Sequence, residues 1–547
     1  MGSLLSRAHL VVREFLALIA TYQELEKRLG QSPGLPSSHP SLSFWTVPKA
    51  SIADHLSDLP KHADIVVIGS GLTGTSFART VLKSERALQV VMLDARQTCA
   101  GASGRNGGHV NPVTYEEYEE LKHEYGAKDA RKIVRFRLKH FPELEKVVKE
   151  EGLLEETEWR SVEHSEVYFE PGQFETAQKR YKIFAADMPE EAAQCKFYDG
   201  KDAIEVKSRT GADDREQRFH VAPDALGCFT SYGGALHPYR FVTGVLARLL
   251  DSYSENFHLL TNTPCTHISP PTSTTPFYTV TTPRGTITAS HVVHATNGHL
   301  SHLLPTFRSK VVPVRATMTA QRPGTSLSKS TLDGRRTFVF YRQKSGYDYL
   351  TQMRSGEHEL MVGGGFGSGS EDALYRNVGN ADDSDYELSL AGHLSGIVPV
   401  HFGEKNWGAE KQPAFHDRDA NDGVEWNQGR VKAIWSGTVA LSADLLPWVG
   451  RLPEKLAGRP CPPPSSTPSI DSLHAPLTAP PGEWVSACYT GEGMVHAWLC
   501  ARALAHMVLG TEKEGGVGDW FPEQMRVTTK RWEKADAERM LARLSAE

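Results

Sequence analysis

Three glycines and one aspartate are the residues whose types and spacing most directly predict chemistry. Gly69, Gly71 and Gly74 have G-x-G-x-x-G spacing, and Asp94 follows twenty residues after the last of them. In this pattern the first glycine allows a tight turn, the second lets the backbone approach a pyrophosphate, and the third allows close helix–strand packing. A helix N-terminus would hold the phosphates, and the carboxylate would bind a ribose. The spacing therefore predicts a dinucleotide site.

The segments around these residues have the composition needed to position them. Ile65–Ile68 is an unbroken run typical of a strand buried on both faces of a parallel sheet, and Val90–Leu93 is a second apolar run that ends at Asp94. The residues after Gly74 are typical of a helix. A G-x-G-x-x-G motif alone is weak support because glycine-rich turns are common. Strand, glycines, helix, strand and acid together strongly favour the ligand site.

A second glycine-rich loop, G-A-S-G-R-N-G-G, covers Gly101–Gly108 directly after this unit. Its backbone N–H groups, with Arg105 as a cation, are suited to a second contact with a pyrophosphate or with a flavin ring. A flexible linker would more often be rich in glycine and serine without the Arg105–Asn106 pair. We therefore interpret this loop as part of the ligand site.

A third glycine turn, Gly491-Glu492-Gly493, precedes an apolar helix that begins near Met494. The positive end of such a helix would stabilise an anionic reduced flavin placed above it. Before this turn, the proline-rich residues 453–483 are predicted to form an irregular surface insertion.

The composition limits the class of protein. The chain has 547 residues, which is too long for one compact core, with 39% hydrophobic and 23% charged residues. The net charge of −6 gives no support to nucleic-acid binding. Seven scattered cysteines without a C-x-x-C pair argue against a disulfide framework or a metal site, and favour a reducing, cytoplasmic location. No apolar run approaches the roughly eighteen residues of a membrane span.

The N-terminal region, residues 1–45, is predicted to be an amphipathic helix from about Leu4 to Leu29 followed by a linker. Prolines in residues 30–62 predict a path over the protein surface. The first six residues also match the N-myristoylation pattern M-G-x-x-x-S, so membrane association remains an alternative to packing on this protein or a partner. The oligomeric state is left open.

The remaining pattern predicts an α/β protein with two main domains. Residues 116–151 are strongly helical, with Pro142 starting a second helix or kinking the first, and the runs at 311–319, 337–341, 347–353 and 359–362 predict an antiparallel sheet. A strand is also expected at Thr263–Cys265. We predict a discontinuous dinucleotide-binding domain (61–115, 225–310 and 431–510), a substrate domain (116–224 and 311–430) and a C-terminal helical tail (511–547).

In motif order, residues 43–510 resemble a known family. The segments A-D-I-V-V-I-G-S-G-L-T-G, G-A-S-G-R-N-G-G, H-A-T-N-G-H, D-L-L-P-W-V-G and G-E-G-M are similar to those of FAD-dependent oxidoreductases of the D-amino-acid oxidase (DAO) type. This superfamily includes sarcosine, glycine and γ-glutamylputrescine oxidases, and the second loop most resembles the last of these. The resemblance implies a Rossmann-like FAD-binding domain with a second, mainly antiparallel substrate domain.

The resemblance also implies which residues bind FAD. These are Gly69, Ser70, Gly71, Thr73, Gly74, Asp94, Ala95, Arg96, Gly101, Ser103, Gly104, Arg105, Asn106, Gly107, Gly108, Cys265, Asn297, Gly298, Asp444, Gly491, Glu492, Gly493 and Met494. Members with covalent flavin use a histidine near Asn106 or a late cysteine. Asn106 cannot form that bond and no cysteine can be assigned to it, so we expect non-covalent FAD. The family usually has a glycine–histidine–glycine turn where this chain has Glu492 between glycines.

The implied reaction is the oxidation of a C–N bond in an amine or amino-acid-like molecule, with hydride transfer to flavin N5 and oxygen as acceptor. His109 is the first candidate to face the substrate, followed by Tyr341 and Glu492, with Tyr349 and Trp435 as weaker candidates. Arg315 or Arg342 could hold a substrate carboxylate. The alternatives are an NAD(P)H-dependent flavin monooxygenase, although no second G-x-G-x-x-G follows a strand, and a flavoprotein without turnover.

Overall fold

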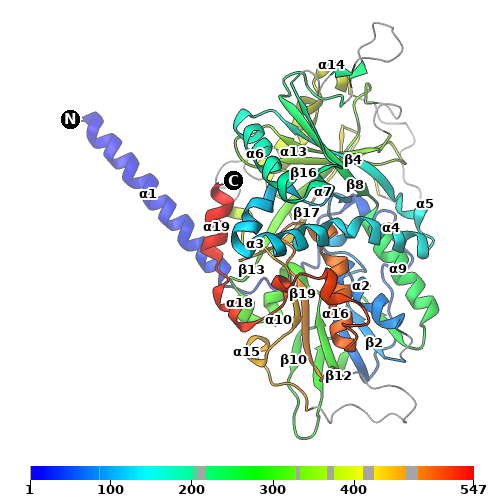
Figure 1. Cartoon of the computed structure of the whole chain (residues 1–547). Helices are drawn as coiled ribbons and strands as arrows, with labels where there is room; N and C mark the ends of the chain where they lie inside the picture. The colour runs from blue at the N-terminus through cyan, green and yellow to red at the C-terminus, as the bar shows by residue number, and fades with distance from the viewer. Residues whose placement is uncertain are drawn as a thin grey trace.

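Two sheets organise the chain (Figure 1). The computed structural model describes residues 2–84, 87–200, 205–206, 216–217, 219–327, 333–365, 375–410, 424–463 and 479–546. In the view of Figure 1 one sheet lies in the lower part of the molecule and the other in the upper part, with α3 (Tyr115–Leu138) and α4 (His140–Glu150) crossing between them. Pro142 lies in the first turn of α4, which confirms the predicted break in this helical region.

The lower sheet has a parallel core in the order β9-β2-β1-β12-β19. Its strands are β1 (His62–Ile68), β2 (Val90–Leu93), β9 (Phe257–Leu260), β12 (Gly285–His294) and β19 (Gly482–Ala487), with β10 (His267–Ser269), β11 (Tyr278–Thr282) and β18 (Trp448–Arg451) added antiparallel. The predicted strand at Thr263–Cys265 is wrong, because these residues follow the end of β9. The predicted strands before Gly69 and Asp94 are confirmed as β1 and β2.

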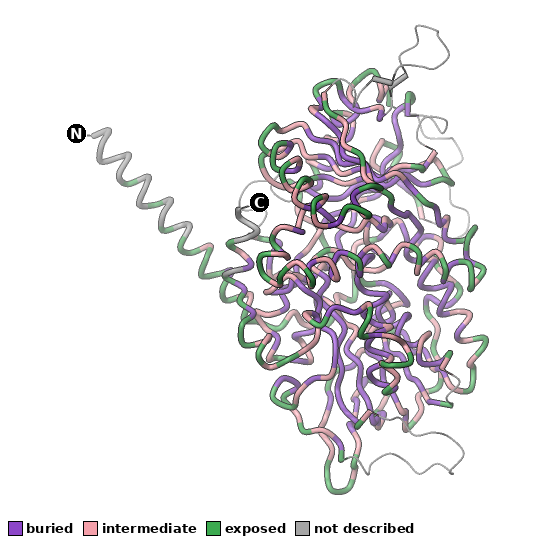
Figure 2. Tube along the Cα trace, in the orientation of Figure 1, coloured by how far each residue is buried: buried purple, intermediate pink, exposed green. Residues whose placement is uncertain are grey.

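Alternate side chains of β1 pack into two different layers. Ile65 and Val67 join a core with α2 (Leu72–Leu82), α9 (Pro238–Ser252) and α16 (Ala497–Leu509), whereas Val66 packs with residues of β10–β12. Ser76 in α2 donates a hydrogen bond of 2.7 Å to the carbonyl oxygen of Trp498 in α16. Both faces of the parallel strands are thus buried, which explains their unbroken apolar sequence (Figure 2).

The upper sheet is antiparallel except where β14 and β4 pair in parallel. Its order is β17 (Val431–Ser442), β13 (Val311–Gln321), β16 (Leu360–Gly364), β15 (Asp348–Gln352), β14 (Arg336–Tyr341), β4 (Arg160–Tyr168), β8 (Gly227–Ala235) and β3 (His109–Val110), with β5 (Lys196–Asp199) against β8. The predicted antiparallel sheet is therefore confirmed. The strands β8 and β17 belong to this sheet, although we predict residues 225–310 and 431–510 in the cofactor-binding domain. The pairing of β8 with β4 and of β17 with β13 places both strands in the upper sheet.

The other elements are short or lie outside the two sheets. The helices are α5 (Leu154–Thr157), α6 (Pro171–Asp187), α7 (Pro189–Ala192), α10 (Leu300–Leu303), α13 (Leu388–Phe402), α14 (Glu404–Trp407), α15 (Glu454–Ala457), α17 (Val517–Trp520), α18 (Thr529–Lys534) and α19 (Ala537–Ala546), and β6 (Glu205–Val206) pairs with β7 (Glu216–Gln217). The helical C-terminal tail is confirmed by α17–α19. Of the predicted insertion at 453–483, residues 464–478 lie outside the described residues.

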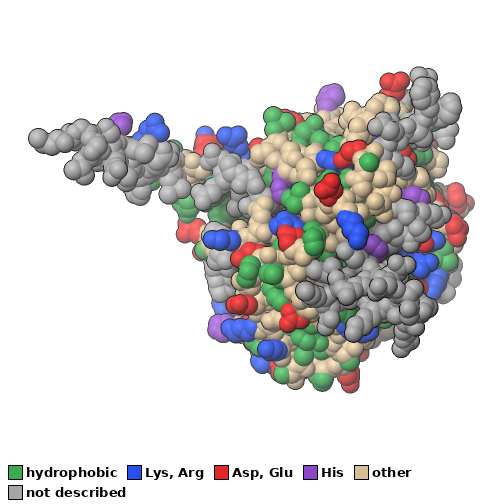
Figure 3. Space-filling model, turned by 90° about the horizontal axis from the view of Figure 1, so that it is seen from above, with side chains coloured by type: hydrophobic (Ala, Val, Ile, Leu, Met, Phe, Trp, Pro, Cys, Tyr) green, Lys and Arg blue, Asp and Glu red, His purple; other side chains and the backbone are tan. Residues whose placement is uncertain are grey.

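The N-terminal helix α1 (Gly2–Leu29) projects from the body of the molecule, and its C-terminal end packs against it (Figures 1 and 3). Leu25 is buried with Val312, Val314 and Met540. Among the described helices, none combines the length and the apolar character needed to cross a bilayer. Acidic and basic side chains are interspersed over the described surface seen in Figure 3.

The segment after α1 follows the predicted surface path over residues 30–42, but buried side chains anchor it from Ser43 onward. Trp45 is only 1% exposed, and its indole Nε1 donates a hydrogen bond of 2.5 Å to the carbonyl oxygen of Asn106. Prolines indicate an extended backbone, but they do not determine whether that backbone is exposed.

Candidate cofactor and active site

A cleft of about 1370 Å³, including the space at its mouth, lies at the carboxyl ends of β1, β2 and β12. Gly69, Asp94 and Thr296 follow these three strands and all line the cleft. Ligands of open α/β sheets bind at this edge. Residues of the first glycine turn, of the second glycine loop and of the turn before α16 all line it, so one elongated ligand could contact all three segments.

The glycines of the first turn are required by close contacts. Gly69 has φ +115°, and a Cβ there would lie 2.6 Å from the carbonyl oxygen of Ala295. A Cβ on Gly71 would lie 2.7 Å from the hydroxyl of Ser103, which accepts a hydrogen bond of 2.9 Å from Leu72 N at the start of α2. A Cβ on Gly74 would lie 2.0 Å from Gly69 O. The third glycine thus allows α2 to pack against the strand end.

Asp94 is held by hydrogen bonds from this turn and from the residue two positions after it in the chain. Its Oδ2 accepts hydrogen bonds from Ser70 N (3.0 Å) and Ser70 Oγ (2.5 Å), and its Oδ1 accepts one from Arg96 N (3.0 Å). Burial raises the pKa of Asp94, while the Ser70 and Arg96 hydrogen bonds oppose that shift. These hydrogen bonds fix the orientation of the Asp94 carboxylate in the wall of the cleft.

The glycine turn before α16 supplies the other end of the cleft. Gly491, Gly493 and Met494 line it together with Tyr489, whose hydroxyl shares a hydrogen bond of 2.7 Å with Thr73 Oγ1 of α2. Glu492 lies behind this lining, with Oε2 3.5 Å from Arg137 Nε. Two segments from opposite ends of the chain thus form one continuous wall.

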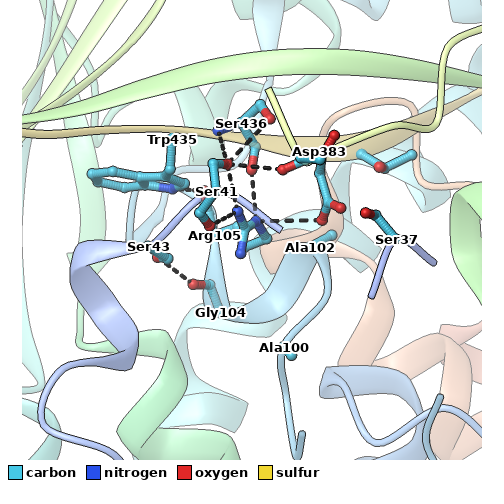
Figure 4. Close-up of polar contacts among 12 residues, drawn as sticks. Ser37, Ser41, Ser43, Ala100, Ala102, Gly104, Arg105, Asp383, Trp435 and Ser436 are labelled. Carbon is cyan, nitrogen blue, oxygen red and sulfur yellow. Dashed lines mark hydrogen bonds and ion pairs between the residues drawn. The ribbon is translucent and has the colours of Figure 1, made fainter. Parts of the chain in front are cut away.

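The second glycine loop divides between the cleft and the protein interior (Figure 4). Ser103 and Asn106 line the cleft, but Arg105 does not, and its guanidinium lies among Ser41, Ser436 and Asp383. Arg105 Nε donates to Ser436 O (2.6 Å) and its Nη2 donates to Ser41 Oγ (2.8 Å). Arg105 therefore connects the loop to β17 and to the segment after α1.

Most predicted cofactor residues meet in this cleft. Those that line it are Gly69, Ser70, Gly71, Thr73, Asp94, Ala95, Arg96, Gly101, Ser103, Asn106, Cys265, Asn297, Gly298, Gly491, Gly493 and Met494. Among the described residues, the predicted ones outside the lining are Gly74, Gly104, Arg105, Gly107, Gly108, Asp444 and Glu492. Asp444 instead pairs with Arg531 at 2.6 Å, which with other hydrogen bonds lowers its pKa against the effect of burial.

Other lining residues are not predicted individually. They include Gly34, Leu35, Pro36, Ala102, Thr296, His299, His302, Asp383, Thr438 and Tyr489. Ala102, Thr296 and His299 lie within predicted segments, and Tyr489 lies next to one. The segment 34–36 and Asp383 lie far along the chain from those motifs, so spacing does not predict them.

His109 lies where the second loop enters the upper sheet as β3. Its ring centroid is 5.0 Å from that of Tyr349, and its Nδ1 is 3.2 Å from the amide nitrogen of Asn111. Burial, followed by the effect of His164, lowers the pKa of His109 to about 3, so the imidazole is neutral.

Tyr341 belongs to a buried network that sequence reasoning missed. Its ring stacks on Tyr168 at 4.7 Å, and Tyr168 donates a hydrogen bond of 2.8 Å to Glu166. Tyr115 also donates to Glu166, and Glu116 is hydrogen-bonded to the same carboxylate. Burial raises the pKa values of Glu116 and Glu166, so the two carboxyl groups share a proton. These residues come from α3 and β4, which are remote from the glycine motifs.

Three weaker candidates have other partners. Arg315 Nε donates to Asn377 Oδ1 (2.9 Å), and Arg342 pairs with Asp224 at 2.7 Å. Trp435 Nε1 donates to Arg105 O (2.9 Å). Tyr349 is placed differently, because a Cβ at Gly107 would lie 2.7 Å from its ring. It therefore packs directly on the second glycine loop.

The cleft fits an elongated dinucleotide such as FAD. A glycine turn at a helix N-terminus, a carboxylate and a second glycine turn all line it. Thr296 Oγ1 is buried in the wall without a hydrogen-bond partner among the described residues, as expected for a group that a ligand satisfies. In the described part of the chain, no cluster of three or more His, Cys, Asp or Glu residues is arranged to hold a metal ion.

Solved structures with a similar fold agree with this architecture. Glycine oxidase from Geobacillus kaustophilus matches with a TM-score of 0.56 and 13% identity, over 84% of this chain and 98% of that one. L-proline dehydrogenase from P. horikoshii matches with a TM-score of 0.55 and 16% identity, over 88% and 99%. Glycine oxidase from Bacillus cereus ATCC 14579 has a TM-score of 0.54 and 14% identity, over 82% and 95%.

Sequence comparison identifies the family. A search of curated protein sequences returns no significant match. The family model described as DAO, FAD dependent oxidoreductase, matches residues 64–507, which include both glycine loops, the turn before α16 and most of both sheets. The chain therefore belongs to the DAO family of FAD-dependent oxidoreductases.

Proposed function

We propose that this enzyme oxidises the C–N bond of a small amine or amino-acid-like molecule, with oxygen as the electron acceptor. The observation that carries this proposal is the direct connection between the cofactor loop and a polar face of the upper sheet. β3 follows Gly108 without interruption and presents His109 beside Tyr349. A molecule bound between the second loop and this face would lie against the cofactor.

The side chains on this face suit an amine. When bound, FAD supplies a two-electron acceptor for the hydride from the carbon next to nitrogen. The substrate nitrogen must be unprotonated, and a buried site favours the neutral amine. The neutral His109 can form a hydrogen bond without adding a positive charge that would repel an incoming ammonium. The proton-sharing pair Glu116–Glu166 carries negative charge within the same lobe.

The arginine contacts favour an amine over an amino acid. Arg315 and Arg342, the residues considered for a substrate carboxylate, already bond Asn377 and Asp224. Both arginines are thus held by protein partners, and neither lines the cleft. We therefore expect amine substrates that carry no carboxylate next to the reacting carbon.

An anaerobic experiment tests the proposal. The purified yellow protein is mixed first with a panel of amines and amino acids and then with NADPH, and the flavin absorbance is followed. We expect bleaching by one or more amines and none by NADPH alone, followed in air by reoxidation with formation of hydrogen peroxide. Bleaching by NADPH alone would replace the proposal with a monooxygenase. Reoxidation that needs an added electron carrier would indicate a dehydrogenase.

A further inference from the structure

Residues 32–47, here called the strap, form part of the wall of the cofactor cleft. Gly34, Leu35 and Pro36 line the cleft directly. The carbonyl oxygen of Gly34 accepts a hydrogen bond of 3.1 Å from His299 Nδ1, and Ser32 Oγ is hydrogen-bonded to His302 Nδ1 at 3.0 Å. The strap thus closes a side of the cleft that the parallel strands leave open, and the buried Trp45 fixes its far end.

Asp383 joins the strap to Arg96, which follows β2, and to Arg105 of the second glycine loop (Figure 4). Its carboxylate accepts two hydrogen bonds of 2.9 Å from Arg96 and lies 3.5 Å from Arg105 Nε. Its backbone oxygen accepts hydrogen bonds from Ser41 N (2.8 Å) and Ser41 Oγ (2.9 Å). Asp383 therefore holds two arginines with its side chain and the strap with its main chain.

The two arginines also hold the strap themselves. Arg96 Nη1 donates to Ser37 O (3.3 Å), and Arg105 Nη2 donates to Ser41 Oγ (2.8 Å). Burial lowers the pKa of Arg105 to about 10, with Asp383 opposing the shift, so Arg105 remains charged at neutral pH. Two buried cations thus share the carboxylate of Asp383, and Arg96 and Asp383 both line the cleft.

We infer that Asp383, Arg96 and Arg105 form a cofactor latch, which keeps the strap closed over bound FAD and slows its dissociation. FAD that leaves on the side covered by Gly34–Pro36 must displace the strap, because these residues are the wall on that side. Removal of the Asp383 charge would leave two buried guanidinium groups without their shared anion, which raises the free energy of the closed state. Opening of the strap would let water solvate these groups, so the open state would become more populated. The inference rests on the FAD of the family and is independent of the proposed substrate.

The test measures FAD release from the holoprotein without substrate. The fluorescence of freed flavin is followed after rapid dilution of wild type and Asp383→Asn, which keeps the size of the side chain. Because breaking a buried ion pair is costly and 1.4 kcal/mol corresponds to a factor of ten, we expect dissociation at least about tenfold faster in the variant. Equal release rates for the two proteins would overturn the inference.

Two further variants separate a latch from general loosening. Leu35→Ala trims a wall residue that is 41% exposed, so it should fold normally and release FAD several times faster than wild type. Asp348→Asn makes the same chemical change at a buried contact with His401 (3.0 Å) in the upper sheet and should leave the release rate unchanged. Release by Asp348→Asn that is as fast as release by Asp383→Asn would contradict the latch. If Asp383→Asn fails to fold, the Leu35→Ala variant decides: an FAD release rate equal to that of wild type would contradict the latch.

Discussion

Arg137 Nε lies 3.5 Å from the carboxylate of Glu492, so α3, which crosses between the two sheets, contacts the glycine turn that lines the cleft. Arg137 is also bound to Glu117 at 2.6 Å. Burial raises the pKa of Glu492 to about 8, with Arg137 opposing the shift and Glu117 and Glu116 adding to it. The Glu492 side chain is 20% exposed, so solvent screens part of this effect.

The raised pKa of Glu492 predicts a pH-dependent stability that Glu492→Gln removes. The folded pKa lies above the ordinary value of 4.5, so the contribution is fully present below pH 4.5 and is lost as the pH rises through about 8. Between pH 5 and 8, the unfolding free energy of wild type should fall relative to the variant by about 1–3 kcal/mol, after allowing for screening. Denaturant unfolding at three pH values measures this. Parallel pH profiles for the two proteins would show that Glu492 is ionised throughout.

His109→Phe should slow flavin reduction by substrate without weakening FAD binding. The imidazole lies on the upper sheet beside Tyr349, outside the cleft lining, and its loss removes one positioned hydrogen-bonding group. Rapid-mixing kinetics with an amine identified from the panel should show a rate lower by roughly 10- to 100-fold. Because the pKa of His109 is about 3, the wild-type rate should show no titration of this group above pH 5.

A matched control for this change is His506→Gln, near the C-terminal end of α16, where the imidazole bonds Thr511. It should leave the rate unchanged. A wild-type rate for His109→Phe would remove His109 from the list of substrate-facing residues.

Gly74→Ala should prevent formation of a stable yellow protein. The added methyl group would lie 2.0 Å from Gly69 O, so α2 would have to move from the strand end, at a cost of about 1–3 kcal/mol or more. Gly396→Ala, in α13, is the control, because it lies outside the cleft lining and within the described chain nothing lies within 4 Å of a Cβ there. Flavin content and melting temperature measure both. Normal flavin binding by Gly74→Ala would show that the backbone at Gly69 can move to accommodate the added methyl group.

Trp45→Ala tests the burial of the strap in the folded protein. The side chain is 1% exposed and contacts Asn106, so its loss should lower the unfolding free energy by about 3–5 kcal/mol. Leu42→Ala, in the same segment but 48% exposed, should change it by no more than about 0.5 kcal/mol. Denaturant unfolding distinguishes them. Similarly small changes in the unfolding free energy for both variants would indicate that the segment around Trp45 is a surface linker.

The nucleotide-binding unit could be predicted because its signals are contiguous. β1, the turn at Gly69–Gly74, α2 and β2 each follow from residues next to one another, and the required glycines coincide with close backbone contacts. The strands between 311 and 364 followed from apolar runs of similarly short range. The domain membership of β8 and β17 could not be read in the same way, because pairing with β4 and β13 determines it.

The sequence by itself determined the cofactor family and the order of the glycine turns, because backbone clearance around a pyrophosphate depends on glycines at close spacing. Only the tertiary structure placed Asp383 between Arg96 and Arg105 and brought residues 34–36 into the cleft wall. A buried ion pair leaves no periodic pattern, since its partners need to be close in space and not in sequence. The same holds for Glu116 and Glu166, whose shared proton depends on burial between α3 and β4.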